Sequence, residues 1–190
     1  MDISKELSKA LEAAEKYVLD GESSEKIYGA QLEEPHLAPW PTEPCKIVFL
    51  DLDGVLNSEL SIKKLGTRFR FAETNVSALN EILQQTQARI VITSTWRSGY
   101  SLPEIASFLE RDGVLAKRVA GKTQILNQPR GLEIDAWLRS VPYAVASYVI
   151  LDDNNDMAMH SNRLVQTAPL MGLTFTQAQR AIELLSVPWT

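Results

Sequence analysis

The residues that most constrain the fold are 46–56, KIVFLDLDGVL, where an apolar run ends in two aspartates and a glycine. A continuous apolar run of this length is typical of a strand in a parallel sheet that is covered on both faces. Burying a carboxylate is costly, so Asp51 and Asp53 need a partner at the end of such a strand. Side chains two positions apart on a strand point to the same side, and we therefore expect both carboxylates to face one site.

Two more apolar runs end in polar residues. ARIVIT ends in Thr93, which Ser94 follows, and YVILDD ends in Asp152 and Asp153. Strands that alternate with helices indicate βαβ units, so we predict an α/β fold with a mostly parallel central sheet flanked by helices. Apolar periodicity predicts helices over 75–86, 101–113, 130–140 and 174–185, and a short strand is expected over 163–168.

The chain is expected to have two parts. Residues 1–45 hold an amphipathic helix over 3–19 and a proline-rich linker, and residues 46–190 form the α/β domain. We expect the helix to pack on this domain; a helix that binds a partner protein is the alternative.

Composition argues against several classes of function. The net charge of −5 disfavours an extensive surface for duplex nucleic acid or for an anionic membrane. Cys45 is the single cysteine, so neither an internal disulfide nor a cysteine-based zinc cluster can form, which suits a reducing compartment. No apolar segment approaches the roughly 18 residues of a membrane span, and the N-terminus lacks the apolar core of a secretory signal. We therefore expect a cytoplasmic protein without a membrane partner, and make no prediction of its oligomeric state.

The polar strand ends are expected to meet, because ligands of open α/β sheets bind outside the carboxyl ends of the strands. Asp51, Asp53 and Asp152 would repel one another there, and a bound divalent cation would remove that repulsion. Oxygen ligands favour Mg²⁺, which commonly bridges to a substrate phosphate. A calcium loop is disfavoured, since DDNNDM has Met157 in place of the glycine and Arg163 in place of the closing acid.

These strand ends resemble the motifs of a known superfamily. FLDLDGVL looks like the first motif of the haloacid dehalogenase (HAD) superfamily, most of whose members are Mg²⁺-dependent phosphatases. IVITS is similar to its second motif and YVILDDNND to its fourth, so the resemblance covers roughly residues 46–185 and implies a Rossmann-like HAD fold. TSTWR, RGLEIDAWL and LVQTAPLMGLT further resemble the HAD domain of Swiss Army Knife RNA repair proteins and stand-alone relatives.

The resemblance implies a role for each motif residue. Asp51 would attack phosphorus and form an aspartyl-phosphate. Asp53 would act as general acid and then base, with its backbone carbonyl on Mg²⁺. Thr93 would hydrogen-bond the transferring phosphoryl group, helped by Ser94. The expected metal ligands are Asp51, Asp53, Asp152 and Asp153, with Asp156 as an alternative to Asp153 in support.

The basic residue of the third motif is either Arg130 or Lys122. Arg130 is preferred because RGLEI matches the family's helix start, although the family more often has lysine. Gly54 would let the chain turn sharply and let the substrate approach the backbone. Arg97 is expected to bind the substrate phosphate, with a surface ion pair as an equal alternative.

The segment after the first motif bears on the kind of substrate. About 20 residues separate DGVLN from the helix over 75–86, which is too few for a large cap domain. Residues 58–72 are basic and aromatic and form either a flap over the substrate, such as a nucleotide or nucleic-acid end, or an ordinary β-hairpin. We expect a Mg²⁺-dependent phosphomonoester hydrolase with a phosphorylated small molecule or nucleic-acid end as substrate. A phosphotransferase and a non-catalytic binding or regulatory protein are the alternatives; Asp53 argues against a dehalogenase.

Overall fold

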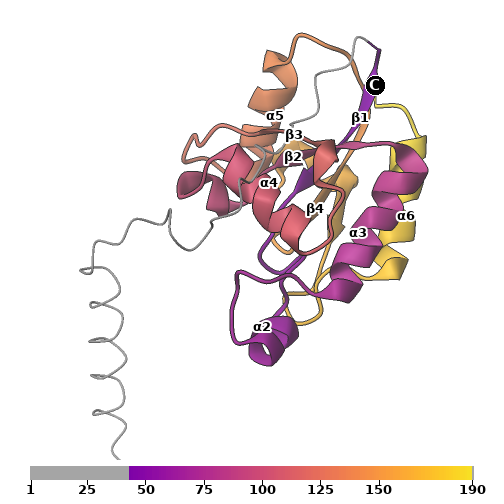
Figure 1. Ribbon diagram of the computed structural model, residues 1–190. Helices are drawn as coiled ribbons and strands as arrows, with labels where there is room; N and C mark the ends of the chain where they lie inside the picture. The colour runs from indigo at the N-terminus through magenta and orange to yellow at the C-terminus, as the bar shows by residue number, and fades with distance from the viewer. Residues whose placement is uncertain (1–42, 190) are drawn as a thin grey trace, which may run out of the picture. The chain divides into compact units, whose positions relative to one another are not determined.

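The sheet is parallel throughout the part of the chain that the computed structural model describes, residues 43–189. Its strand order is β3-β2-β1-β4-β5, which confirms the predicted α/β class. Figure 1 labels the strands β1 to β4 and the helices around them. The strands are β1 (Cys45–Leu50), β2 (Arg89–Ile92), β3 (Val119–Lys122), β4 (Val145–Asp152) and β5 (Leu164–Gln166). The helix predicted over 3–19 and nearly all of the linker lie outside the described residues, so the division at residue 45 stays a prediction.

The four predicted helices are present and end close to their sequence signals. They are α3 (Glu73–Thr86), α4 (Leu102–Arg111), α5 (Arg130–Ser140) and α6 (Phe175–Ser186). Ser101 caps α4 and Thr174 caps α6, each through a hydroxyl that accepts a hydrogen bond from a backbone N–H of the first turn. Pro103 lies in the first turn of α4, where its missing N–H costs nothing.

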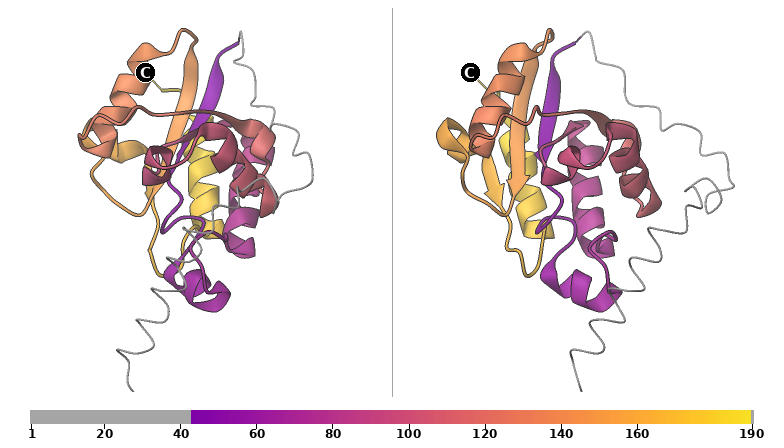
Figure 2. Two further views of the ribbon diagram at one scale, coloured as in Figure 1. Left: turned by 60° about the vertical axis from the view of Figure 1, so that its left-hand side comes forward. Right: turned by 90° about the vertical axis from the view of Figure 1, so that its left-hand side faces the viewer.

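Both faces of the sheet are buried, as the continuous apolar runs predict. Val48 and Leu50 of β1 belong to a core cluster that includes side chains of α3, α4 and α6, whereas Ile47 and Phe49 belong to a second cluster with α5. Figure 2 shows α5 on one side of β1 and β4 and α3 on the other. This double burial fixes the level at which β1 ends, and therefore the position of Asp51, the next residue.

Two elements differ from the sequence predictions. Residues 58–72 contain the helix α2 (Glu59–Leu65) and no strand, so the hairpin alternative is wrong. Ser58 caps this helix in a capping box and Gly66, at φ 71°, ends it. Because α2 is the only helix between β1 and α3, the expectation of a minimal cap holds. The edge strand β3 was not predicted.

None of the helices within residues 43–189 combines the length and the apolar character needed to cross a membrane.

Candidate active site

The ends of β1, β2 and β4 lie level with one another. Leu50 is the register partner of Ile92 on one side and of Leu151 on the other. One residue further, Thr93 N donates to Leu50 O at 2.9 Å and Asp51 N donates to Leu151 O at 3.0 Å. The three predicted polar strand ends therefore meet at the carboxyl ends of the three central strands of the sheet.

Three carboxylates form a cluster at this edge. Asp51, Asp152 and Asp153 each offer one oxygen, and these oxygens lie within 4.8 Å of one another. Asp51 and Asp152 are buried, and Asp153 is half-buried. A buried, oxygen-only donor set with this surplus of negative charge fits Mg²⁺, which favours carboxylates and keeps several waters.

Arg130 is the cation within this cluster. Its Nη1 donates to Asp51 Oδ1 and to Asp152 Oδ2, both at 2.8 Å. The start of α5 is held in place by Asp156, which accepts from Arg130 N through Oδ2 at 3.2 Å and from Gly131 N through its carbonyl at 3.1 Å. Gly131 packs so closely on the Met157 carbonyl that a Cβ would overlap it.

Lys122 lies apart from the acidic cluster. Its Nζ donates to Arg97 O at 3.2 Å and to Tyr100 O at 3.3 Å, so it closes the turn after β2. Of the two candidates for the third motif, Arg130 is therefore the one in contact with the carboxylates.

The electrostatics of the cluster follow from burial. Burial raises the pKa of Asp51, and the charge of Arg130 opposes this shift. Burial, and next the charge of Asp51, raise the pKa of Asp152 to about 7. Although burial alone would lower the pKa of Arg130, Asp51 and Asp152 raise it. Protons and a metal cation therefore compete for the same oxygens, and a bound cation would favour the ionised carboxylates.

Two hydroxyls follow β2. Both side chains are fully buried, and Thr93 Oγ1 has no hydrogen-bond partner among the described residues. The Ser94 hydroxyl bonds to Asp51, which lowers the pKa of that carboxyl against the larger effect of burial. Burying an unpaired hydroxyl is unfavourable, so Thr93 is available to bind a ligand at the strand ends.

Asp53 has its own set of partners outside the acidic cluster. Its carboxylate accepts hydrogen bonds from Asn57 Nδ2 at 2.8 Å, from Trp96 Nε1 at 3.0 Å and from Arg68. The sequence did not predict the contacts of Trp96 and Arg68. Asp53 is expected to bind the metal through its backbone carbonyl oxygen, and none of these three side-chain hydrogen bonds involves that oxygen.

Position 54 needs a glycine because the Asp153 side chain lies against its backbone. Its φ is 72°, in the left-handed region, and a Cβ built there would lie 2.5 Å from Asp153 Oδ2. The glycine therefore allows the predicted sharp turn, and what approaches its backbone is a carboxylate of the acidic cluster.

Arg97 is a buried structural residue in this arrangement. Its guanidinium forms an ion pair with Glu133 and donates to the carbonyls of Thr93 and Ser94, the latter at 2.7 Å. The surface ion pair considered for Arg97 is wrong, because both side chains are buried. Burial lowers the pKa of Arg97, and Glu133 opposes this. Its Nη1 holds the hydroxyl-bearing turn and its Nη2 pairs with Glu133, so these donors do not point free towards a phosphate as expected.

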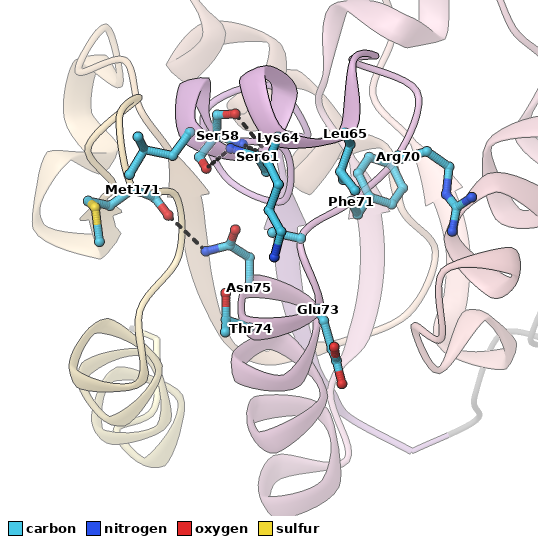
Figure 3. A pocket seen from close by; sticks show the side chains of 12 residues that line it. Ser58, Ser61, Lys64, Leu65, Arg70, Phe71, Glu73, Thr74, Asn75 and Met171 are labelled. Atoms are coloured by element: carbon cyan, nitrogen blue, oxygen red, sulfur yellow. Dashed lines mark hydrogen bonds between the residues drawn. The ribbon is translucent and has the colours of Figure 1, made fainter.

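A separate pocket of about 460 Å³ lies between α2 and the start of α3 (Figure 3). Figure 3 shows Lys64 reaching into it from α2, while Asn75 donates to the Met171 carbonyl at its side. None of the predicted site residues lines this pocket.

Comparison with known proteins gave one match. Residues 47–178 match the family described as the HAD domain in Swiss Army Knife RNA repair proteins. No curated protein and no solved structure matches the chain. The matched range runs from β1 into α6 and includes every predicted site residue.

Proposed function

The chain belongs to the family of the HAD domain in Swiss Army Knife RNA repair proteins, and from this premise we propose that it is a Mg²⁺-dependent phosphomonoester hydrolase with an aspartyl-phosphate intermediate. Membership of this family supports a hydrolase of the phosphatase kind. The observation that carries the finer proposal is the meeting of Asp51, Asp152 and Asp153 around Arg130 at the strand ends.

Asp51 is the nucleophile of the proposed reaction. One of its oxygens attacks phosphorus and the bond from phosphorus to the ester oxygen breaks. Asp53, which enters the reaction protonated, gives that oxygen its proton. Asp53, now ionised, takes a proton from water, which attacks the phosphorus of the aspartyl-phosphate. Phosphate leaves with the water oxygen, and the Asp51 carboxylate is regenerated.

The remaining residues position these two aspartates and the phosphoryl group. Arg130 supplies positive charge beside Asp51. The Thr93 hydroxyl, which is buried without a partner, and the Ser94 hydroxyl, which bonds to Asp51, would bind the phosphoryl oxygens. Asp51, Asp152 and Asp153, with the Asp53 carbonyl, would hold Mg²⁺. When bound, the metal offsets the charge of the phosphoryl oxygens.

Asn57 and Trp96 hold the Asp53 carboxylate from two sides, so it is fixed in direction before a substrate arrives. Arg97 keeps the Thr93–Ser94 turn in place and is therefore a positioning residue. We assign Arg130 to the third motif and leave Lys122 a structural role.

The test is hydrolysis of an aryl phosphate with Mg²⁺ and with EDTA, for the unchanged protein, Asp51→Asn and Glu183→Gln. Glu183 is an exposed carboxylate on α6, paired with Arg180, and serves as the matched control. We expect activity with Mg²⁺ only, its loss in Asp51→Asn and its retention in Glu183→Gln. Activity that survives in Asp51→Asn would refute the mechanism.

A further inference from the structure

The leaving group of the proposed reaction must lie on the Asp53 side of the phosphorus, because Asp53 gives the proton to the departing oxygen. A cavity of about 220 Å³ lies on this side, lined by Arg68, Phe69, Thr95, Trp96, Gly99 and Tyr100. Two of these residues, Trp96 and Arg68, also bond to the Asp53 carboxylate. The cavity and the catalytic acid are therefore linked through these two residues.

An exposed aromatic ring forms one wall of this cavity. Phe69 is 41% exposed, although its ring centroid lies 5.4 Å from that of Trp96 and 6.4 Å from that of Tyr100. Its segment is fixed to the end of α4, since Arg111 donates to the Phe69 carbonyl and Phe71 N donates to Asp112 at 2.8 Å. A ring that is held in place yet exposed beside a catalytic group is suited to stack on a planar ligand.

Arg68 provides a cation next to this ring. Its side chain is 56% exposed and pairs with Asp53, whose two other donors, Asn57 and Trp96, come from the body of the domain. An ion pair this exposed contributes little to stability, so an anionic group can attract Arg68 at small cost. The guanidinium fork binds phosphate oxygens well.

We propose that Phe69 and Arg68 form a leaving-group subsite for nucleotides. The base stacks on Phe69, and Arg68 leaves Asp53 to bind a second phosphate on the same sugar. This rests on the proposed function and names the substrate class of that site: phosphomonoesters whose alcohol carries a nucleobase, with preference for those with a second phosphate.

The ring half of the subsite is tested with adenosine 5′-monophosphate and ribose 5-phosphate, which have the same ester chemistry and differ in the base. Stacking on one aromatic side chain predicts a KM about 5- to 150-fold lower for the nucleotide. Phe69→Ala and Phe69→Leu should remove most of this ratio, and Phe175→Ala, which truncates another exposed phenylalanine, should preserve it. Phe69→Leu keeps an apolar side chain and covers the case in which the alanine variant fails to fold.

The cation half is tested with adenosine 3′,5′-bisphosphate against the monophosphate. Arg68→Gln should abolish the advantage of the second phosphate, so that the bisphosphate and the monophosphate have equal KM values. Arg180→Gln, an exposed arginine on α6, is the control and should leave that advantage unchanged.

Binding to Asp51→Asn, measured by calorimetry with the same three compounds, separates the subsite from the reaction. A binding preference for the nucleotide that depends on Phe69 supports the subsite, whether or not the unchanged protein hydrolyses the compounds. If the unchanged protein hydrolyses none of them, that result refutes the proposed function and not the subsite. Equal dissociation constants for the nucleotide and ribose 5-phosphate, or a preference that Phe69→Leu leaves intact, would overturn the subsite.

Discussion

Replacing Gly54 by alanine tests whether the turn after β1 and the acidic cluster are built together. The backbone at Gly54 has a φ of 72°, and a Cβ there would lie 2.5 Å from Asp153 Oδ2 and 2.9 Å from Asp153 Cβ. Alanine at a left-handed position costs about 1–2 kcal/mol. The contact requires Asp153 to rotate or shift in addition, at about 0.5–1.5 kcal/mol for a side chain forced off its rotamer.

Gly66 provides a matched control for the backbone contribution. Its φ is 71°, and a Cβ there would have nothing within 4 Å. Gly66→Ala should therefore lower the free energy of unfolding by the conformational cost alone, whereas Gly54→Ala should lower it by both. Chemical denaturation in EDTA measures the two values, and we expect Gly54→Ala to be the more destabilising by about 0.5–1.5 kcal/mol.

The same pair of variants separates stability from metal binding. Displacing Asp153 should weaken Mg²⁺ binding about 10-fold or more in Gly54→Ala, while Gly66→Ala binds as the unchanged protein does. Isothermal titration with Mg²⁺ measures both affinities. Equal destabilisation of the two variants together with equal Mg²⁺ affinity would refute the close approach of Asp153 to the turn.

Three further predictions concern the same site. Without Mg²⁺, burial raises the pKa of Asp152 from 3.8 to about 7, so the folded state binds this proton more tightly than the unfolded state does. The free energy of unfolding should therefore fall as the pH rises between these two values. Mg²⁺ should accordingly raise the unfolding temperature more above pH 7 than at about pH 5, where protons compete with it for the carboxylate oxygens. Arg97→Met should cost about 3–5 kcal/mol in chemical denaturation, because it leaves the buried charge of Glu133 without its cation. Gly131→Ala should cost about 1–3 kcal/mol by overpacking on the Met157 carbonyl, and should lower the rate of phosphate release by moving the start of α5.

Each of these predictions has its own control. Asp152→Asn should flatten the dependence of stability on pH in the absence of metal, and an unchanged slope would contradict the assignment. Arg139→Ala breaks an exposed pair with Asp135 and should cost less than about 1 kcal/mol, so a cost equal to that of Arg97→Met would argue against a special role of burial. Gly113→Ala has open space around its Cβ, and a loss of activity equal to that of Gly131→Ala would contradict the packing argument.

The position of the acidic cluster could be predicted from the sequence for a physical reason. A buried apolar run fixes where a strand ends, and parallel strands that neighbour one another place their ends at one edge. Asp51 and Asp152 come directly at two such ends, and the structure places them within reach of one cation. Arg130 was preferred over Lys122 from its place at a helix start, and the contacts of the two residues agree with that choice.

The partners of Asp53 could not be predicted, because they depend on tertiary contacts. Trp96 lies 43 positions along the chain from Asp53, and Arg68 lies 15 positions away on a segment without regular structure. The pair of Arg97 with Glu133 spans 36 positions, and no local pattern indicates that the two would be buried together. Such pairs require knowledge of how α5 and the turn after β2 pack.

The elements β3 and α2 depart from the sequence predictions for two different physical reasons. The four residues of β3, VAGK, include a glycine and only two apolar side chains, so no strand pattern is present. For α2 a signal did exist: Ser58 and Gly66 are a suitable N-cap and C-cap, and Lys63 and Lys64 suit the last turn.

The most direct test of the central claim is to trap the phosphorylated protein. A substrate with a radiolabelled phosphate is mixed with the protein and Mg²⁺ and quenched in acid during the first turnovers, and the protein is then digested. The account predicts label on the peptide that contains Asp51, its release by hydroxylamine, and no label in Asp51→Asn. Turnover without any labelled protein, or label on a peptide without Asp51, would contradict it.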